Sequence, residues 1–234
     1  VTMQPAGDRG LILKTKDLSE DVHQQILTKL SLDGNNQLTE KKFDSIGPVI
    51  GKELKSKSVT GILIVISVII LYIAFAFRKV SQPVSSFYFG LFAVVALIHD
   101  VTIPTGVFAV LGHLYGVEID ILFVTALLTV LGFSVHDTIV VYDRTRENLR
   151  KGIGRTFEET VGISLSQTIV RSINTSLTVL LVLSAVFFYG GESTKYFSLA
   201  LIIGVVFGTY SSIFLASPLL VTLHKWQLSR VGKK

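Results

Sequence analysis

Two adjacent His-Asp pairs inside long apolar segments are the residues of this chain best suited to chemistry. His99 and Asp100 lie near the middle of one segment, and His136 and Asp137 lie in the second half of the next. An ionisable side chain inside a membrane span costs at least about 2.5 to 3.5 kcal/mol, so such groups face the protein interior and mark an ion pathway or a proton relay. The alternative role is a hydrogen bond between two helices.

Asp137 has the more polar surroundings of the two carboxyl groups. Ser134 lies one turn before it. Further polar residues, spaced four, three and four apart, share one face of the segment that enters a later apolar run: Gln167, Arg171, Asn174 and Thr178. Burial disfavours the charged form of a carboxyl group and a nearby cation favours it, so a group balanced between the two titrates when a helix moves.

The sequence therefore predicts Asp137 as the proton-responsive residue and Arg171 as its electrostatic partner. An Arg near a membrane boundary also extends readily to water, which is the alternative for Arg171. The secondary candidates are Asp100, His99 and His136.

Metal and nucleotide chemistry have little support in the sequence. Adjacent residues on a helix point about 100° apart, so both members of a His-Asp pair cannot easily converge on one ion. The HExxH pattern of helical zinc proteases and the GxxxxGK[ST] pattern of nucleotide-binding loops do not occur, and the chain has no cysteine. We expect no catalytic residue, no metal and no other cofactor, and an intramembrane metal hydrolase is the weakest alternative.

The composition requires that much of the surface faces lipid. Hydrophobic residues make up 49% of the 234 residues and charged residues 17%, and the mean hydropathy is +0.58. These values are too apolar for an ordinary soluble domain. The net charge of +5 comes from short Lys and Arg blocks beside apolar runs, which is typical of membrane topology signals. No basic stripe or recognition motif is present, so the bilayer is an expected partner and nucleic acid is not.

Five apolar segments predict an α-helical polytopic membrane protein. The segment 59–77 has 19 residues without a charge, and a helix of that length spans about 28 Å. The other predicted spans are 84–111, 119–142, 174–189 and 196–223. Within the connector 143–173, Thr156 and Glu159 form a capping-box pattern that predicts an amphipathic helix on the membrane surface.

Residues 1–58 are the only sizeable polar stretch, and they predict part of an α+β domain. A strand is expected over 10–16, a helix beginning near Ser19, and a turn at Gly34-Asn35-Asn36. One short strand and one or two helices cannot enclose a core, so we expect this stretch to be an incomplete domain.

The Lys and Arg residues predict the orientation in the membrane. If all five spans cross, one side receives Arg78, Lys79, Arg144, Arg146, Arg150, Lys151, Arg155, Lys225, Arg230, Lys233 and Lys234. The loops on the other side, 113–118 and 190–195, hold a single Lys. The positive-inside rule then places the tail 224–234 in the cytoplasm and residues 1–58 outside.

A ridge of small residues in the last span predicts close helix packing. The ridge contains a GxxxG pattern and consists of Gly204, Gly208 and Ser212, with Ala216 at the next step of four. Small residues at this spacing let the backbone of a neighbouring helix approach closely.

Three segments of the sequence resemble a known family. Residues 46–54 (IGPVIGKEL) precede the first span, residues 132–148 (GFSVHDTIVVYDRTREN) end the third, and Gln167-Thr168 with Arg171-Ser172 leads into the fourth. They are similar to three characteristic motifs of the SecF family of Sec translocon accessory subunits, which is related to SecD and to the resistance-nodulation-division transporters. The resemblance covers nearly the whole chain. Many members have Asn where this chain has His136, so the polarity and proton affinity around Asp137 are expected to differ from the family's usual site.

The resemblance implies a subunit of the cell membrane that pairs with a SecD-like protein beside the SecY channel complex. It also implies that the proton gradient is used to promote the export of preproteins. The family has six spans with an extracytoplasmic domain between the first two, so we expect this sequence to lack the first span and the first part of that domain. The alternative is a proton-coupled exporter of small solutes or lipids from the related resistance-nodulation-division superfamily.

Overall fold

The structure is a computed structural model that describes residues 2–6, 10–15, 18, 20–31, 39–41, 48–76, 83–117 and 119–231. The chain folds as two compact units, Val1–Thr60 and Gly61–Lys234. Several residues named in the sequence analysis lie outside the described residues: Ser19, the turn at 34–36, Arg78, Lys79, Lys233 and Lys234.

The first unit contains a β-hairpin and a helix. Strands β1 (Thr2–Ala6) and β2 (Gly10–Lys14) pair antiparallel, with Thr2 opposite Lys14. Helix α1 (Glu20–Leu30) has two acidic residues in its first turn, where their negative charges interact favourably with the helix dipole. The buried His23 of α1 lies with its Nε2 3.0 Å from Glu40 Oε1. Strand β2 matches the expected strand, whereas β1 was not predicted because its sequence, TMQPA, is short and contains a proline.

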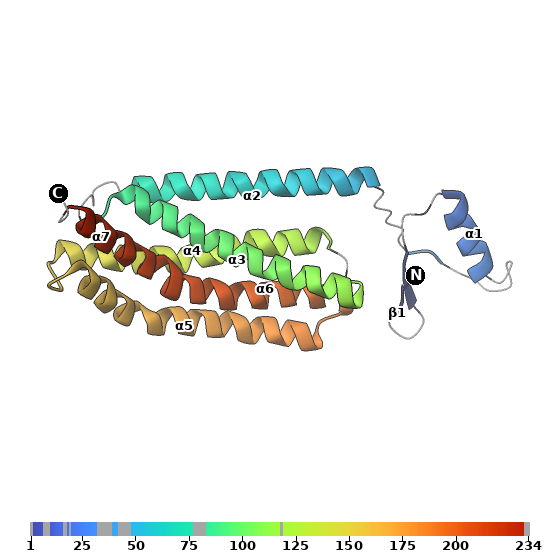
Figure 1. Ribbon diagram of the computed structural model, residues 1–234. Coiled ribbons are helices and arrows are strands. Elements are labelled where there is room, and N and C mark those ends of the chain that lie inside the picture. The colour runs from blue at the N-terminus through green and yellow to red at the C-terminus, as the bar shows by residue number, and fades with distance from the viewer. Residues whose placement is uncertain are drawn as a thin grey trace. The chain divides into compact units, whose positions relative to one another are not determined.

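Five segments of the described chain are long and apolar enough to cross a membrane, as the sequence predicts. They belong to helices α2 (Pro48–Ala76), α3 (Ser86–Tyr115), α4 (Ile121–Arg150), α5 (Phe157–Tyr189), and the continuous run of α6 (Glu192–Ser211), the π-helical turn η1 (Ser212–Ala216) and α7 (Ser217–Val231). Helices α3 to α7 run alongside one another as a bundle (Figure 1). The connector expected over 143–173 is mostly helix, because α4 continues to Arg150 and α5 begins at Phe157.

A short turn makes α4 and α5 antiparallel neighbours. Thr156 Oγ1 accepts a hydrogen bond of 3.1 Å from the Glu159 backbone N–H, and Glu159 accepts one of 2.6 Å from the Arg155 N–H, so the predicted capping interaction is confirmed. Gly154 has φ +92°, and a Cβ at this position would lie 2.6 Å from Thr160 Oγ1. Only glycine fits there, and the tight turn sets the two helices side by side.

The bundle has an apolar cluster on each side of a polar layer. One cluster includes Phe89, Ala96, Tyr142 and Ala216, with the rings of Phe89 and Tyr142 packed edge to face at 5.0 Å. The other includes Phe108, Phe123, Val130 and Ala200. Along the helices between them lie buried polar residues: Asp100, Ser134, Asp137 and Ser211. The packing of these helices therefore places polar groups at the centre of the bundle.

Helix α6 approaches α4 closely at two glycines of the small-residue ridge. A Cβ on Gly204 would lie 2.1 Å from Val130 Cγ2, and one on Gly208 would lie 3.0 Å from Ser134 Cβ. Contacts of this kind matter because lipid tails are as apolar as a core side chain, so membrane helices associate through close packing and hydrogen bonds.

We expect Gly204→Ala to destabilise the bundle by about 1 to 3 kcal/mol, because the added methyl forces α6 away from α4. Gly132→Ala is the matched control, since outside the local backbone of α4 no atom of the described structure lies within 4 Å of a Cβ built at Gly132. The melting temperatures of the purified variants in detergent measure the difference. Equal melting temperatures for the two variants would show that the α4–α6 contact does not limit stability.

Candidate functional site

Asp100 of α3 is fully buried and links three helices by hydrogen bonds. Its Oδ2 accepts from Ser134 Oγ of α4, and from Ser211 Oγ of α6 at 2.8 Å. Its Oδ1 lies 2.8 Å from Nδ1 of His99. Both carboxyl oxygens therefore have partners within the protein.

His99 lies between this buried carboxyl group and the bundle surface. Its side chain is 27% exposed. Its ring centroid lies 6.3 Å from that of Tyr210 and 6.2 Å from that of Phe207, both on α6. These aromatic neighbours fix the imidazole beside Asp100.

Two prolines loosen the backbone next to the Asp100 cluster. Pro104, inside α3, has no N–H to donate to the carbonyl of Asp100 four residues earlier. Pro218 follows the π-helical turn η1, where the helix is wider than an α-helix. Side chains satisfy carbonyls of this turn, since Ser217 Oγ donates to the Ser212 carbonyl at 3.1 Å and Tyr142 Oη donates to the Ala216 carbonyl at 3.2 Å. Side-chain hydrogen bonds thus hold the helices where the backbone ladder is interrupted.

Asp137 lies one turn from Ser134 on α4 and is also buried, with 2% exposure. Its Oδ1 is 3.8 Å from Nδ1 of His136, whose side chain is 61% exposed. Its Oδ2 has no hydrogen-bond partner in the described part of the chain. Asp137 is therefore less completely satisfied than Asp100.

Two hydroxyl groups that neighbour Asp137 come from α5 and α6. They belong to Ser172 and Thr209. Ser172 Oγ is buried and, like Asp137 Oδ2, lacks a hydrogen-bond partner among the described residues. Thr209 Oγ1 lies 2.5 Å from Ser176 Oγ, which joins α6 to α5. Asp137 thus sits where α4, α5 and α6 meet.

Arg171 lies next to Ser172 along α5 but lines a different space. A pocket of 320 Å³ between α4 and α5 is lined by Val140, Asp143, Arg144, Glu147, Gln167, Thr168 and Arg171. Arg171 is exposed, and no hydrogen bond or ion pair between Arg171 and Asp137 occurs among the described residues. The predicted partners thus come from neighbouring positions of the bundle without direct contact in this conformation.

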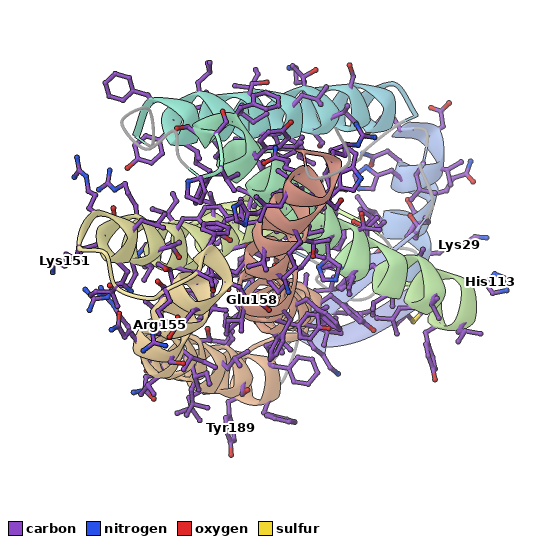
Figure 2. The ribbon with its side chains drawn as sticks, turned by 60° about the vertical axis from the view of Figure 1, so that its left-hand side comes forward. Lys29, His113, Lys151, Arg155, Glu158 and Tyr189 are labelled. Atoms are coloured by element: carbon purple, nitrogen blue, oxygen red, sulfur yellow. The ribbon has the colours of Figure 1, made fainter. Side chains whose placement is uncertain are left out.

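A hydrogen-bond network borders this pocket. Gln167 Oε1 accepts from Arg144 Nε at 2.6 Å and from Asn148 Nδ2 at 3.0 Å. The buried Asn148 also donates to Ser164 Oγ at 2.8 Å. The network ties α4 to α5 near their shared turn, where the exposed side chains of Lys151 and Arg155 lie on the outside of the bundle (Figure 2).

The buried face of α5 differs from the polar face that sequence reasoning singled out. Asn174 and Thr178 are exposed, and the buried polar residues follow steps of four: Thr160, Ser164, Thr168, Ser172 and Ser176. Sequence reasoning also missed Thr209 and Ser211 on α6. A four-residue repeat of small hydroxyl side chains was the available signal for the α5 face.

Metal ligands do not cluster in the described residues. No group of three or more His, Cys, Asp or Glu side chains in that part of the chain could hold an ion.

Comparison with known proteins identifies the family of the chain. Residues 26–226 match the family described as protein export membrane protein SecD/SecF, C-terminal. The chain is 47% identical over 234 residues to the protein translocase subunit SecF of Thermobaculum terrenum, which covers 100% of this chain and 73% of that protein. The chain belongs to the SecF family. The SecF subunit of Anaerolinea thermophila is 39% identical over 92% of this chain and 69% of its own length.

A solved structure agrees with this assignment to the SecF family. The crystal structure of SecDF in its super-membrane-facing form is similar with a TM-score of 0.71 and 31% identity. The match covers 92% of this chain and 28% of that chain, so the present sequence spans less than a third of the SecDF polypeptide.

The family fixes the broad function of the chain. It is a SecF-type subunit of the Sec protein export machinery and a multi-pass membrane protein. The relatives named above are protein translocase subunits, which does not favour the solute-exporter alternative.

We expect Gln167→Leu to destabilise the α4–α5 pair by about 1 to 3 kcal/mol, because it leaves a donor of the buried Asn148 side chain unpaired. Gln167→Glu keeps an acceptor oxygen for both donors and should melt close to the unsubstituted protein. Thermal unfolding in detergent compares the two. If Gln167→Leu melts no lower than Gln167→Glu, the network does not join the helices.

Proposed function

We propose that this subunit couples proton movement to the export of preproteins and that Asp137 is the group that binds and releases the proton. The observation that carries the proposal is that Oδ2 of this buried carboxyl group, where three helices meet, has no hydrogen-bond partner among the described residues. A buried group of this kind inside a span is a functional candidate by its cost alone.

The neighbouring hydroxyl group suits both protonation states of Asp137. A serine hydroxyl donates to an ionised carboxylate and accepts from a protonated carboxyl group. Ser172 Oγ is buried and has no other partner in the described structure, so it is available for either role. Ser172 Oγ and Asp137 Oδ2 can therefore pair across α4 and α5 in either protonation state, with the hydroxyl as donor or as acceptor.

We assign Arg171 the role of electrostatic partner to Asp137. Arg171 is adjacent to Ser172 on α5, so movement of α5 relative to α4 changes its distance from the carboxyl group. A cation that approaches favours the charged form, and one that retreats favours proton uptake. The same movement changes the pocket that Arg171 lines.

The proton gradient supplies enough energy to bias such a movement. One charge that crosses 100 mV is worth about 2.3 kcal/mol. A bias of that size shifts a two-state equilibrium by about fiftyfold towards one conformation. In this proposal, the residues 1–58 form part of an extracytoplasmic domain that follows the change.

The proposed partners are a SecD-like subunit, the SecY channel complex and the exported preproteins. The similarity to a structure named SecDF supports a SecD partner. The basic turn between α4 and α5 and the basic end of α7 support a cytoplasmic location for that end of the bundle.

Asp137→Asn should insert and assemble normally while proton-gradient-dependent export is lost, since the amide keeps the shape but cannot titrate. The measurement is secretion of a model preprotein into membrane vesicles that contain equal amounts of each variant. Asp120→Asn makes the same chemical change at the N-cap of α4, where Asn also caps well, and should export normally.

Arg171→Ala in the same vesicles tests the pairing. Its loss of export should be less than additive with that of Asp137→Asn if the two residues act as one unit. Full export by Asp137→Asn would remove this residue from the mechanism, and strict additivity would remove Arg171 as its partner.

The orientation is tested by single cysteines, which have no background because the chain contains no cysteine. Tyr115→Cys and Tyr189→Cys, at exposed ends of α3 and α5, should react with an impermeant maleimide in intact cells. Lys151→Cys and Ser229→Cys should react only after the cells are opened. The reverse pattern would invert the proposed topology.

A further inference from the structure

We propose that Asp100 is a positioning residue that holds Asp137 in its place through Ser134, by hydrogen bonding alone and without exchanging a proton. This inference rests on the proposed role of Asp137. It separates two buried carboxyl groups of the same bundle into one that binds the proton and one that fixes the helices around it.

The geometry around Ser134 makes it the link between the two carboxyl groups. Ser134 donates to Asp100 Oδ2 and lies three residues before Asp137 on the same face of α4. On its other side, the backbone of α6 is so close that a Cβ on Gly208 would lie 3.0 Å from the Ser134 Cβ. Ser134 is thus held between α3 and α6, and its position sets the place of Asp137.

A second link reaches Asp137 through α6. Ser211 donates to Asp100 Oδ2 at 2.8 Å, and Thr209 of the same turn is a neighbour of Asp137. Thr209 also lies 2.5 Å from Ser176 of α5. The Asp100 carboxyl group therefore orders α4 and α6, and α5 through them.

Helix α3 depends on these side-chain bonds because its own backbone is interrupted at this point. Pro104 removes the N–H that would pair with the Asp100 carbonyl. A helix without that bond bends more easily. The bonds from Asp100 to Ser134 and Ser211 fix α3 against its neighbours where the backbone is weakest.

Both carboxyl oxygens of Asp100 have hydrogen-bond partners, which distinguishes this residue from a proton carrier. Asp100 is fully buried, and its side-chain hydrogen bonds in the described structure are to Ser134, Ser211 and His99. An asparagine can make the same contacts, since its Oδ1 accepts from His99 and its NH₂ donates to two hydroxyl oxygens. An alanine can make none of them. Asp100→Asn and Asp100→Ala therefore separate hydrogen bonding from titration.

The test measures gradient-dependent export of a preprotein in vesicles with equal amounts of each variant. Asp100→Asn should export within about twofold of the unsubstituted chain, and Asp100→Ala should lose export by about tenfold or more, the effect of unpaired buried groups. Thr102→Ala is the matched control on α3, because Thr102 is exposed and its hydroxyl donates to the Ile98 carbonyl of its own helix. It should export normally.

A second readout follows the geometry around Asp137 without using export. Thr138, the next residue of α4, is 1% exposed, and Thr138→Cys places a single thiol there. Its reaction with a maleimide should be slow with Asp100 or Asp100→Asn, and about tenfold faster with Asp100→Ala. If Asp100→Ala fails to accumulate, Ser134→Ala replaces it, and faster labelling of the thiol is again the expected result.

Three results would overturn the inference. Loss of export in Asp100→Asn with a protected thiol would mean that Asp100 itself exchanges a proton. Full export by Asp100→Ala, or unchanged thiol labelling in both Asp100→Ala and Ser134→Ala, would mean that the cluster positions nothing. Failure of the Asp137 proposal is read separately, from export by Asp137→Asn, and does not alter the labelling result.

Discussion

A carboxyl group in the middle of a membrane bundle has to find its hydrogen-bond partners inside the protein, and the arrangement of α3, α4 and α6 follows from the way Asp100 does so. Ser134 and Ser211 come from two different helices and meet at one oxygen of this side chain. Lipid offers no substitute for these donors, so a shift of any of the three helices leaves a buried polar group unpaired. The apolar clusters on either side accept many alternative packings, whereas this cluster accepts few.

The proposed role of Asp137 depends on the fixed position of the hydrogen-bonded cluster around Asp100. Asp137 shares a face of α4 with Ser134, yet its Oδ2 and the nearby Ser172 Oγ have no partners in the described structure. A helix movement would break hydrogen bonds of the Asp100 cluster, whereas it could form a new one between Asp137 and Ser172. Ser134, which is bonded to Asp100, lies one helical turn from Asp137 on α4, so a rigid support stands beside a group that responds to protonation. The tight turn at Gly154 brings α5 to the side of Asp137.

Much of this organisation can be predicted from the sequence, because long apolar segments, cap residues and buried charges leave strong local signals. The five membrane-spanning segments and the Thr156–Glu159 capping interaction are of this kind. The rotation of α5 about its axis cannot be predicted in this way, because polar side chains near a membrane surface face either water or protein. In the structure Arg171 and Asn174 are exposed and the small Ser172 is buried, and the sequence pattern alone does not distinguish these outcomes.

The central claim is that one of these carboxyl groups takes up the proton and the other does not. Infrared difference spectroscopy of the protein in lipid, between high and low pH, detects the carbonyl stretch of a carboxyl group as it becomes protonated. We expect a carbonyl band of a newly protonated carboxyl group that disappears in Asp137→Asn and persists in Asp100→Asn. A band that persists in Asp137→Asn and disappears in Asp100→Asn would contradict the central claim.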